Sequence, residues 1–352
     1  MCCEATALRE QPLLATVLAG GTAAGRTVTV VLLGLLLGLL LGCGPSDGVK
    51  TLHIGHALDT EHPVHTAMLH IDERLRHYSG DTLRVSVFPN GQLGHERELI
   101  ELLQLGALAM TKVSASPLEG FVPAMKVFNV PYLFRDTAHY RAVLDGPVGR
   151  ELLLAPEAVR LRGLGYFDAG SRSFYSTERP VFTPRDLMGM KIRVQESQTA
   201  INMVSQLGAS PTPIAWGELY TALQQGVVDG AENNPPSFYL SKHFEIARYY
   251  TLDEHTAVPD ILLISQPVWD DLSATEQQWL QRAVDDSVQL QRELWSKMTE
   301  HAVKQVEAAG VTIIRPDKKL FSARVVAMKR AYEGTAVGQV IQRIEAVTSA
   351  SD

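Results

Sequence analysis

The sequence predicts an α/β fold organised as two lobes. The chain has 352 residues, which is more than most single domains hold. Short strand patterns alternate with amphipathic helix patterns from Thr51 onward, and a second series of this kind begins near Gly170. A helical pattern from Ser273 to Ala309 is long enough, at about 1.5 Å per residue, to brace both lobes.

The first series has the order of a βαβαβ unit. Strands are expected at TLHIGHA, TLRVSVF and LAMTKVS. Pro63 can open the first helix, and Gly106 ends the second, ERELIELLQLG. Parallel strands in such a unit are covered by helices on both faces, and ligands gather at their carboxyl ends. The apolar face of the first helix is formed by Val64, Met68, Ile71, Leu75 and Tyr78.

The second series places a strand at MKIRV and a helix at 200–207, and the strand LLISQ returns to the first lobe. Ser273 and Glu276 form a capping box at the start of the long helix, which ends at Gly310. We therefore expect mixed sheets flanked by helices, with the long helix bridging the lobes. Residues 51–169 with 260–298 are assigned to lobe I, and residues 170–259 with 299–352 to lobe II.

The beginning of the chain has the pattern of an export signal. Residues 28–41 read VTVVLLGLLLGLLL, which is shorter than the about 20 apolar residues that span a bilayer and matches the hydrophobic region of a signal peptide. Gly42 and Cys43 follow this segment. Together with its last two leucines they form the sequence Leu-Leu-Gly-Cys43, which resembles the lipobox of bacterial lipoproteins. We expect a signal peptide at 1–42, a lipidated Cys43 and a tether at 43–50. An uncleaved N-terminal anchor is the alternative, and both export the globular part.

The composition excludes several classes of protein. A net charge of −7 argues against nucleic-acid binding and means that local cations must capture any anionic ligand. The three cysteines are Cys2, Cys3 and Cys43, so the exported domain must fold without a disulfide. A Gly-rich phosphate loop, a nucleophile elbow and a His/Cys metal pattern are all missing, so we expect neither an enzyme nor a cofactor. The alternative of a metal site would use His53, His56, His62 and His65; hydrogen-bonded or solvated histidines are the simpler interpretation.

Two arginines are candidates for binding an anion. Arg193 alternates with Ile192 and Val194 in a predicted strand, so its side chain points away from two core residues. Arg172 lies beside the lobe boundary in YFDAGSRSFYS. A guanidinium group binds a carboxylate with two parallel hydrogen bonds. The alternative for these arginines is an internal salt bridge with Asp168, Asp229 or Glu232.

Trp216 is placed where a helix begins. Pro211 and Pro213 keep the preceding stretch out of a helix, and free backbone N–H groups at the first turn face the same side as the ring. The tryptophan is therefore either the lid of a pocket or a core residue.

Four stretches together resemble the substrate-binding subunits of TRAP transporters, the tripartite ATP-independent periplasmic systems, in their DctP-like group. They are LGASPTPIAWGELYTALQQGVVDGAENN, FPNGQLGHERELIELLQLGALAMT, VPYLFRD and LMGMKIRV. The resemblance runs from about Thr51 to the C-terminal helices. It implies a two-lobed periplasmic binding protein that closes on an organic acid and delivers it to a small and a large integral membrane subunit. We expect an extracytoplasmic monomer that is held at a membrane by its lipid anchor.

The resemblance also assigns roles to residues. It implies that Arg193 clamps the ligand carboxylate and that Arg172 is the second arginine found in many members. It implies that Trp216 covers the ligand, that Asn233 hydrogen-bonds near the carboxylate and that Glu96 accepts hydrogen bonds from hydroxyl groups.

Three further residues align with positions near the cleft. His56 and Lys112 match positions on the pocket wall. His255 matches a histidine near the closed cleft, where it either contacts the ligand or supports the hinge. Ser114 stands where sialic-acid binders carry a glutamate, which argues against that ligand.

The resemblance favours a hexuronate ligand such as glucuronate or galacturonate. A C4-dicarboxylate or a 2-oxo acid is the alternative within the family. A ligand-sensing accessory lipoprotein is an alternative of another class. An exported hydrolase is disfavoured because no nucleophile–base pair is found.

Overall fold

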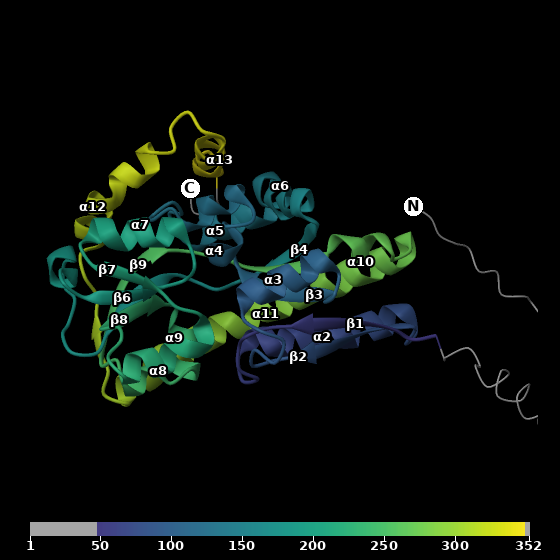
Figure 1. Ribbon diagram of the computed structural model, residues 1–352, viewed down its shortest axis with the longest axis horizontal. Coiled ribbons are helices and arrows are strands. Elements are labelled where there is room, and N and C mark those ends of the chain that lie inside the picture. The colour runs from purple at the N-terminus through teal and green to yellow at the C-terminus, as the bar shows by residue number, and fades with distance from the viewer. Residues whose placement is uncertain (1–47, 349–352) are drawn as a thin grey trace, which may run out of the picture. The chain divides into compact units, whose positions relative to one another are not determined.

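The structure is a computed structural model that describes residues 48–348 (Figure 1). The expected signal peptide at 1–42, the lipidation site Cys43 and the tether up to residue 47 lie outside the described residues. The residues from Lys50 onward cluster into one unit. In that described part of the chain, no helix is both long enough and apolar enough to cross a membrane.

The sheet of lobe I has five strands in the order β2-β1-β3-β10-β4 (Figure 1). β1 is parallel to β2 and β3, as the βαβαβ pattern predicts, whereas β10 is antiparallel to β3 and β4. The direction of β10 places its first residue, Asp260, opposite Ser114 at the end of β3. The strands are β1 (Lys50–Gly55), β2 (Leu83–Phe88), β3 (Met110–Ser114), β4 (Leu161–Phe167) and β10 (Asp260–Ser265).

Helices cover both faces of this sheet. α2 begins at Pro63, as the sequence predicts, and its buried residues lie in one core with Leu262 and Ile264 of β10. Ile261 and Leu263 point to the opposite face and lie in a second core. The helices are α2 (Pro63–Ser79), α3 (Glu96–Leu105), α4 (Ala115–Leu118), α5 (Thr137–Asp145), α6 (Pro147–Leu154) and α10 (Gln266–Asp270), with 3₁₀ helices η1 (Pro123–Asn129) and η2 (Ala155–Val159).

The sheet of lobe II has six strands in the order β11-β9-β5-β8-β6-β7, of which β6, β7, β8 and β9 are labelled in Figure 1. β6, β7 and β8 are parallel, and β5 is antiparallel to both of its neighbours. The strands are β5 (Arg172–Ser176), β6 (Lys191–Val194), β7 (Ser210–Pro213), β8 (Gly230–Asn233), β9 (Tyr249–Thr256) and β11 (Thr312–Ile314). The helices are α7 (Gln198–Leu207), α8 (Leu219–Gln224), α9 (Pro235–Leu240) and α12 (Lys318–Arg330), with η3 (Pro184–Leu187), η4 (Trp216–Glu218) and η5 (His243–Glu245).

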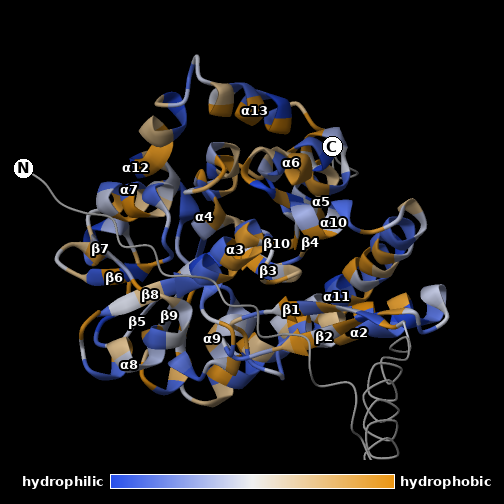
Figure 2. Cartoon of the chain, turned by 45° about the vertical axis from the view of Figure 1, so that its right-hand side comes forward, coloured by the Kyte–Doolittle hydropathy of each residue, from blue (hydrophilic) through white to orange (hydrophobic). Residues whose placement is uncertain are grey.

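The long helix α11 (Ala274–Ala308) bridges the two lobes, which confirms the prediction. Ser273 and Glu276 form the expected capping box at its start. Val284 packs in the core of lobe I, and Val306 packs in a core of lobe II. Figure 2 shows hydrophobic and hydrophilic residues alternating around α11, as expected for a helix that packs along one side.

The last helix, α13 (Ala336–Glu345), differs from the expected assignment of residues 299–352 to lobe II. α12 does pack there, but α13 buries Ile341 and Ile344 in a core of lobe I. His139 also contacts the carbonyl oxygen of Ile344 through Nε2 at 2.9 Å. The reason is that α13 is amphipathic and needs an apolar surface, which lobe I provides. The chain thus crosses between the lobes once more, at residues 331–335.

Candidate functional site

A cavity lies between the two sheets, at the edge where β3 and β8 end and where β5 and β10 begin. Five of the eight residues expected to bind the ligand line it: Glu96, Lys112, Arg172, Trp216 and Asn233. The other lining residues are Ala57, Leu58, His62, Ser114, Ala169, Gln195, Asn234, Ser237, Val258, Asp260 and Trp295.

Arg193 lies in β6 beside this cavity and is 2% exposed. Its Nε donates to the carbonyl oxygen of Ile214 at 2.8 Å, and its Nη1 is buried without a hydrogen-bond partner in residues 48–348. The guanidinium carbon lies 6.0 Å from the centre of the Trp216 ring. Arg193 lines a second cavity that shares Glu96, Gln195 and Trp216 with the first.

The surroundings of Arg193 are those of an anion site. Burial lowers the pKa of this guanidinium, which still remains protonated at neutral pH. An unpaired buried charge is costly unless a counter-charge arrives. The geometry therefore suits a ligand carboxylate.

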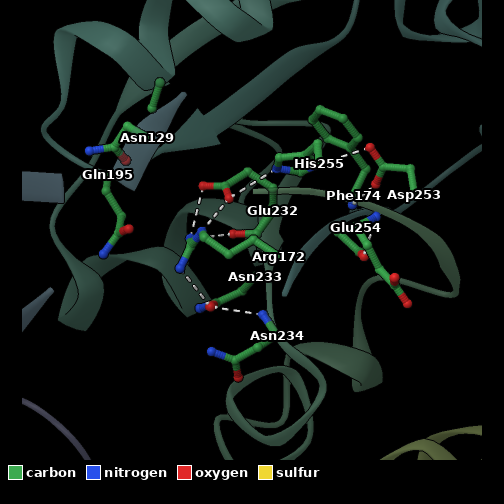
Figure 3. A network of polar contacts seen from close by, with 12 residues as sticks. Asn129, Arg172, Phe174, Gln195, Glu232, Asn233, Asn234, Asp253, Glu254 and His255 are labelled. Atoms are coloured by element: carbon green, nitrogen blue, oxygen red, sulfur yellow. Dashed lines mark hydrogen bonds and ion pairs between the residues drawn. The ribbon is translucent and has the colours of Figure 1, made fainter. Parts of the chain in front are cut away.

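Arg172 is already paired within the protein (Figure 3). It donates to both carboxylate oxygens and the carbonyl oxygen of Glu232, and from Nη1 to Oδ1 of Asn233 at 2.9 Å. These bonds use four of its five N–H groups. Burial alone lowers the pKa of Arg172, but Glu232 outweighs it and raises the pKa. The alternative of an internal salt bridge with Glu232 is therefore realised, and Arg172 orients Asn233.

The side-chain oxygen of Asn233 is already hydrogen-bonded within the protein. Oδ1 accepts from Arg172 and from the backbone N–H of Asn234, at 2.9 Å in both cases. Within the described part of the chain, Nδ2 has no partner, so this group is the one that can donate to a ligand in the cavity.

His255 lies behind Glu232 and does not line the cavity (Figure 3). Nδ1 is 2.9 Å from Oδ2 of Asp253, and Nε2 is 3.4 Å from Oε2 of Glu232. Burial by itself lowers the pKa of His255, but the two carboxylates outweigh it and raise the pKa to about 9. Burial raises the pKa of Glu232, but Arg172 and His255 lower it to about 2. His255 contacts Glu232 on the side away from the cavity, so it can hold this carboxylate in place for Arg172.

The charge of His255 should make the free energy of unfolding depend on pH. Its folded-state pKa of about 9 lies above the ordinary 6.5, so the stabilisation is complete below pH 6.5 and is lost as the pH rises through 9. We expect wild type to lose stability relative to His255→Gln over this interval, by on the order of a few kcal/mol. Urea unfolding of both proteins at several pH values measures the difference. A constant difference across the interval contradicts the charged state of His255.

On the lobe I side, Lys112 links two carboxylates. Its Nζ lies 3.2 Å from Oε1 of Glu96 and 3.0 Å from Oδ1 of Asp260. Burial lowers the pKa of Lys112, but the two carboxylates outweigh it and raise the pKa. Oε1 of Glu96 also accepts from the backbone N–H of Ser114 at 3.0 Å. Oε2 of Glu96 and Oδ2 of Asp260 remain as acceptors beside the cavity.

Trp216 and Ser114 make contacts between the lobes at the cavity. Trp216 is half-buried and packs against apolar cores of both lobes. Ser114 of lobe I donates from Oγ to Oε1 of Gln195 in lobe II at 3.3 Å. Both cross-lobe contacts depend on the distance between the lobes.

His56 directly follows β1 of lobe I, is buried, and does not line either of the two cavities. Its Nε2 lies 3.0 Å from Nδ1 of His65, and its Nδ1 accepts from the backbone N–H of Leu58. Burial, with the charge of Lys112, lowers its pKa to about 3. Throughout residues 48–348, no three or more His, Cys, Asp or Glu side chains are grouped to hold a metal ion.

Sequence reasoning missed several cavity residues, among them Asp260 and Gln195. Gln195 directly follows the strand KIRV, so the rule that ligands gather at strand ends could have found it. Asp260 is at the beginning of its strand, and it reaches the ligand edge only because β10 is antiparallel. The other missed residues with polar or aromatic side chains are His62, Asn234, Ser237 and Trp295.

Comparison with known proteins agrees with this architecture. The family model for bacterial extracellular solute-binding protein family 7 matches residues 54–337. The chain belongs to this family. Family 7 includes the solute-binding proteins of TRAP transporters, as the sequence resemblance indicates. The family consists of receptors that bind a solute outside the cytoplasm.

Three relatives illustrate the similarity of this family 7 member. It is 39% identical to the uncharacterized protein YiiZ of Salmonella typhimurium, over 80% of this chain and 86% of the relative. A TRAP periplasmic solute-binding protein of Bradyrhizobium, crystallised with galacturonate, is 41% identical with a TM-score of 0.82, over 84% of this chain and 99% of that chain. One from Anaerococcus prevotii, crystallised with glucuronate, is 33% identical with a TM-score of 0.82, over 86% and 100%.

Proposed function

We propose that the protein is the extracytoplasmic receptor of a TRAP transporter for a hexuronate, glucuronate or galacturonate, which it binds through the carboxylate. One observation carries this proposal: within residues 48–348, the buried guanidinium of Arg193 has an Nη1 without a hydrogen-bond partner, and Arg193 lines the second cavity, which shares Glu96, Gln195 and Trp216 with the first. Because Glu232 already pairs with Arg172, Arg193 is the one of these two arginines that remains to bind a ligand carboxylate. The uronates bound to relatives of 33–41% identity support the same class of ligand.

The rest of the cavity suits the hydroxyl groups of a sugar acid. Glu96 and Asp260 offer carboxylate oxygens as acceptors, and the amide nitrogen of Asn233 offers a donor. A hydroxyl group can both donate and accept, so it uses both kinds of partner. Trp216 covers the ligand with an aromatic face. No step of this function breaks a covalent bond, and the protein acts as a receptor rather than an enzyme.

A thermal-shift screen tests the class of ligand. The compounds in the screen are glucuronate, galacturonate, aldonates, C4-dicarboxylates and 2-oxo acids, each at the same concentration. We expect the largest rise in melting temperature with a hexuronate, because a ligand that binds the folded state stabilises it by mass action. A larger rise with a dicarboxylate or a 2-oxo acid overturns the hexuronate assignment.

Delivery to the membrane subunits depends on movement of the lobes. Ligand groups contact both lobes, so the ligand binds the closed arrangement more tightly and shifts the population toward it. The closed monomer then presents a different surface to the small and large membrane subunits. The hinge comprises the crossings near 169 and 260 together with α11.

We also propose that the receptor is held at the membrane through acylated Cys43. The support is the lipobox-like sequence directly after the apolar segment. Inhibition of lipoprotein signal peptidase with globomycin should make the precursor accumulate, and Cys43→Ala should abolish incorporation of a labelled fatty acid into the protein. Mass spectrometry that finds an intact Met1 contradicts the anchor.

A further inference from the structure

His62 lines the ligand cavity, and one of its ring nitrogens is buried without a hydrogen-bond partner in the described part of the chain. The residue is the N-cap of α2, and its Nδ1 accepts from the backbone N–H of Val64 at 3.3 Å. This bond requires a lone pair on Nδ1, so the hydrogen of the neutral ring is on Nε2. Nε2 is buried and, within residues 48–348, has no hydrogen-bond partner.

The surroundings of His62 keep this ring neutral. The residue is 3% exposed, and its ring centre lies 5.7 Å from that of Trp295. Burial, assisted by the positive charge of Lys112, lowers the pKa of His62 well below its ordinary value. His62 therefore offers a single neutral N–H rather than a charge. Leaving a buried N–H without an acceptor is unfavourable, so a partner supplied from the cavity would gain a full hydrogen bond.

The other polar groups on the lobe I side show what that partner can be. Glu96 and Asp260 are acceptors, and Lys112 donates to both of them. A hydroxyl group that donates to a carboxylate still has lone pairs to be satisfied. A neutral donor on the same side complements the two carboxylates and favours an uncharged oxygen.

We propose that His62 is a ligand-binding residue that donates from Nε2 to a hydroxyl or ring oxygen of the sugar acid on the lobe I side of the cavity. This inference rests on the proposed function and deepens it, because it assigns recognition of the sugar to lobe I and recognition of the carboxylate to Arg193 in lobe II. His62 thereby selects polyhydroxylated acids over acids that lack an oxygen at this position.

The test uses D-galacturonate as the probe and His62→Asn as the variant. Asparagine is a preferred N-cap residue, so it can keep the bond to Val64 while it removes the imidazole Nε2. We expect calorimetry to show about tenfold weaker binding, the effect of one hydrogen bond, with little change in the melting temperature without ligand. The matched control is His65→Asn on the same helix, because His65 contacts His56 and does not line the cavity. Its affinity should equal that of wild type.

A second measurement needs no variant. In ¹⁵N-labelled wild type, the imidazole Nε2–H resonance of His62 should shift when D-galacturonate is added. Wild-type affinity in His62→Asn, or an unchanged resonance at saturation, overturns this inference while the proposed function stands. A wild-type protein that binds no uronate overturns the proposed function and this inference with it.

Discussion

Arg193→Ala is expected to weaken hexuronate binding by about 3–5 kcal/mol, roughly a hundred- to several-thousand-fold. In the part of the chain that the structure describes, the wild-type guanidinium is buried and its Nη1 has no hydrogen-bond partner, so a ligand carboxylate can accept a hydrogen bond from it. In the variant, the ligand carboxylate enters the same dry site without its charge partner, and much of the loss is the cost of burying that unpaired charge. Isothermal calorimetry of the uronate identified by the screen measures the loss.

Two further variants make this result specific. Arg193→Lys should recover little of the affinity, because an ammonium group is a point charge and cannot form the planar pair of hydrogen bonds. Arg185→Ala removes an exposed arginine from the same lobe and should bind like wild type. Unchanged affinity in Arg193→Ala means that the carboxylate site lies elsewhere.

Glu232→Gln is expected to lower the free energy of unfolding by about 3–5 kcal/mol. Glutamine has nearly the same shape as glutamate, so packing is preserved. The change leaves the buried guanidinium of Arg172 and the protonated ring of His255 without the carboxylate between them. Urea unfolding in the absence of ligand measures the effect.

An exposed ion pair provides the matched control. Glu151 contacts Arg343, and their side chains are 60% and 45% exposed. Glu151→Gln should change the free energy of unfolding far less than Glu232→Gln does, because solvent screens the exposed pair and Arg343 remains hydrated. Equal losses for the two variants show that Glu232 does not hold the network together.

Local signals in the sequence were enough to predict several elements. Pro63 and the capping box of Ser273 with Glu276 define helix starts, because they act through neighbouring backbone groups. The position of α13 could not be predicted in this way. An amphipathic helix shows that it needs an apolar surface, but not which lobe supplies that surface.

In the candidate site, too, features set by neighbouring residues could be predicted, whereas contacts set by the tertiary fold could not. Alternation along β6 predicted that Arg193 points away from the residues of its lobe core, and this depends on backbone geometry alone. Arg172 pairs with Glu232, which lies 60 positions away in the sequence. The sequence left three possible partners open, because such a distant contact depends on the fold of the whole sheet. Asp260 was missed because strand direction is a property of the sheet and not of the strand itself.

The final crossing of the chain limits how the receptor works. α12 packs on lobe II and α13 packs on lobe I, so residues 331–335 are a covalent connection between the lobes. In the proposed mechanism the lobes move apart to admit a solute, and this connection must span the distance between them. In the structure these residues form turns between the two helices (Figure 1). Fully extended, the steps from Arg330 to Ala336 cover roughly 20 Å. The largest possible distance between the end of α12 and the start of α13 is therefore set by the covalent length of residues 331–335. This limit is the same whatever solute, pH or membrane partner drives the lobes apart.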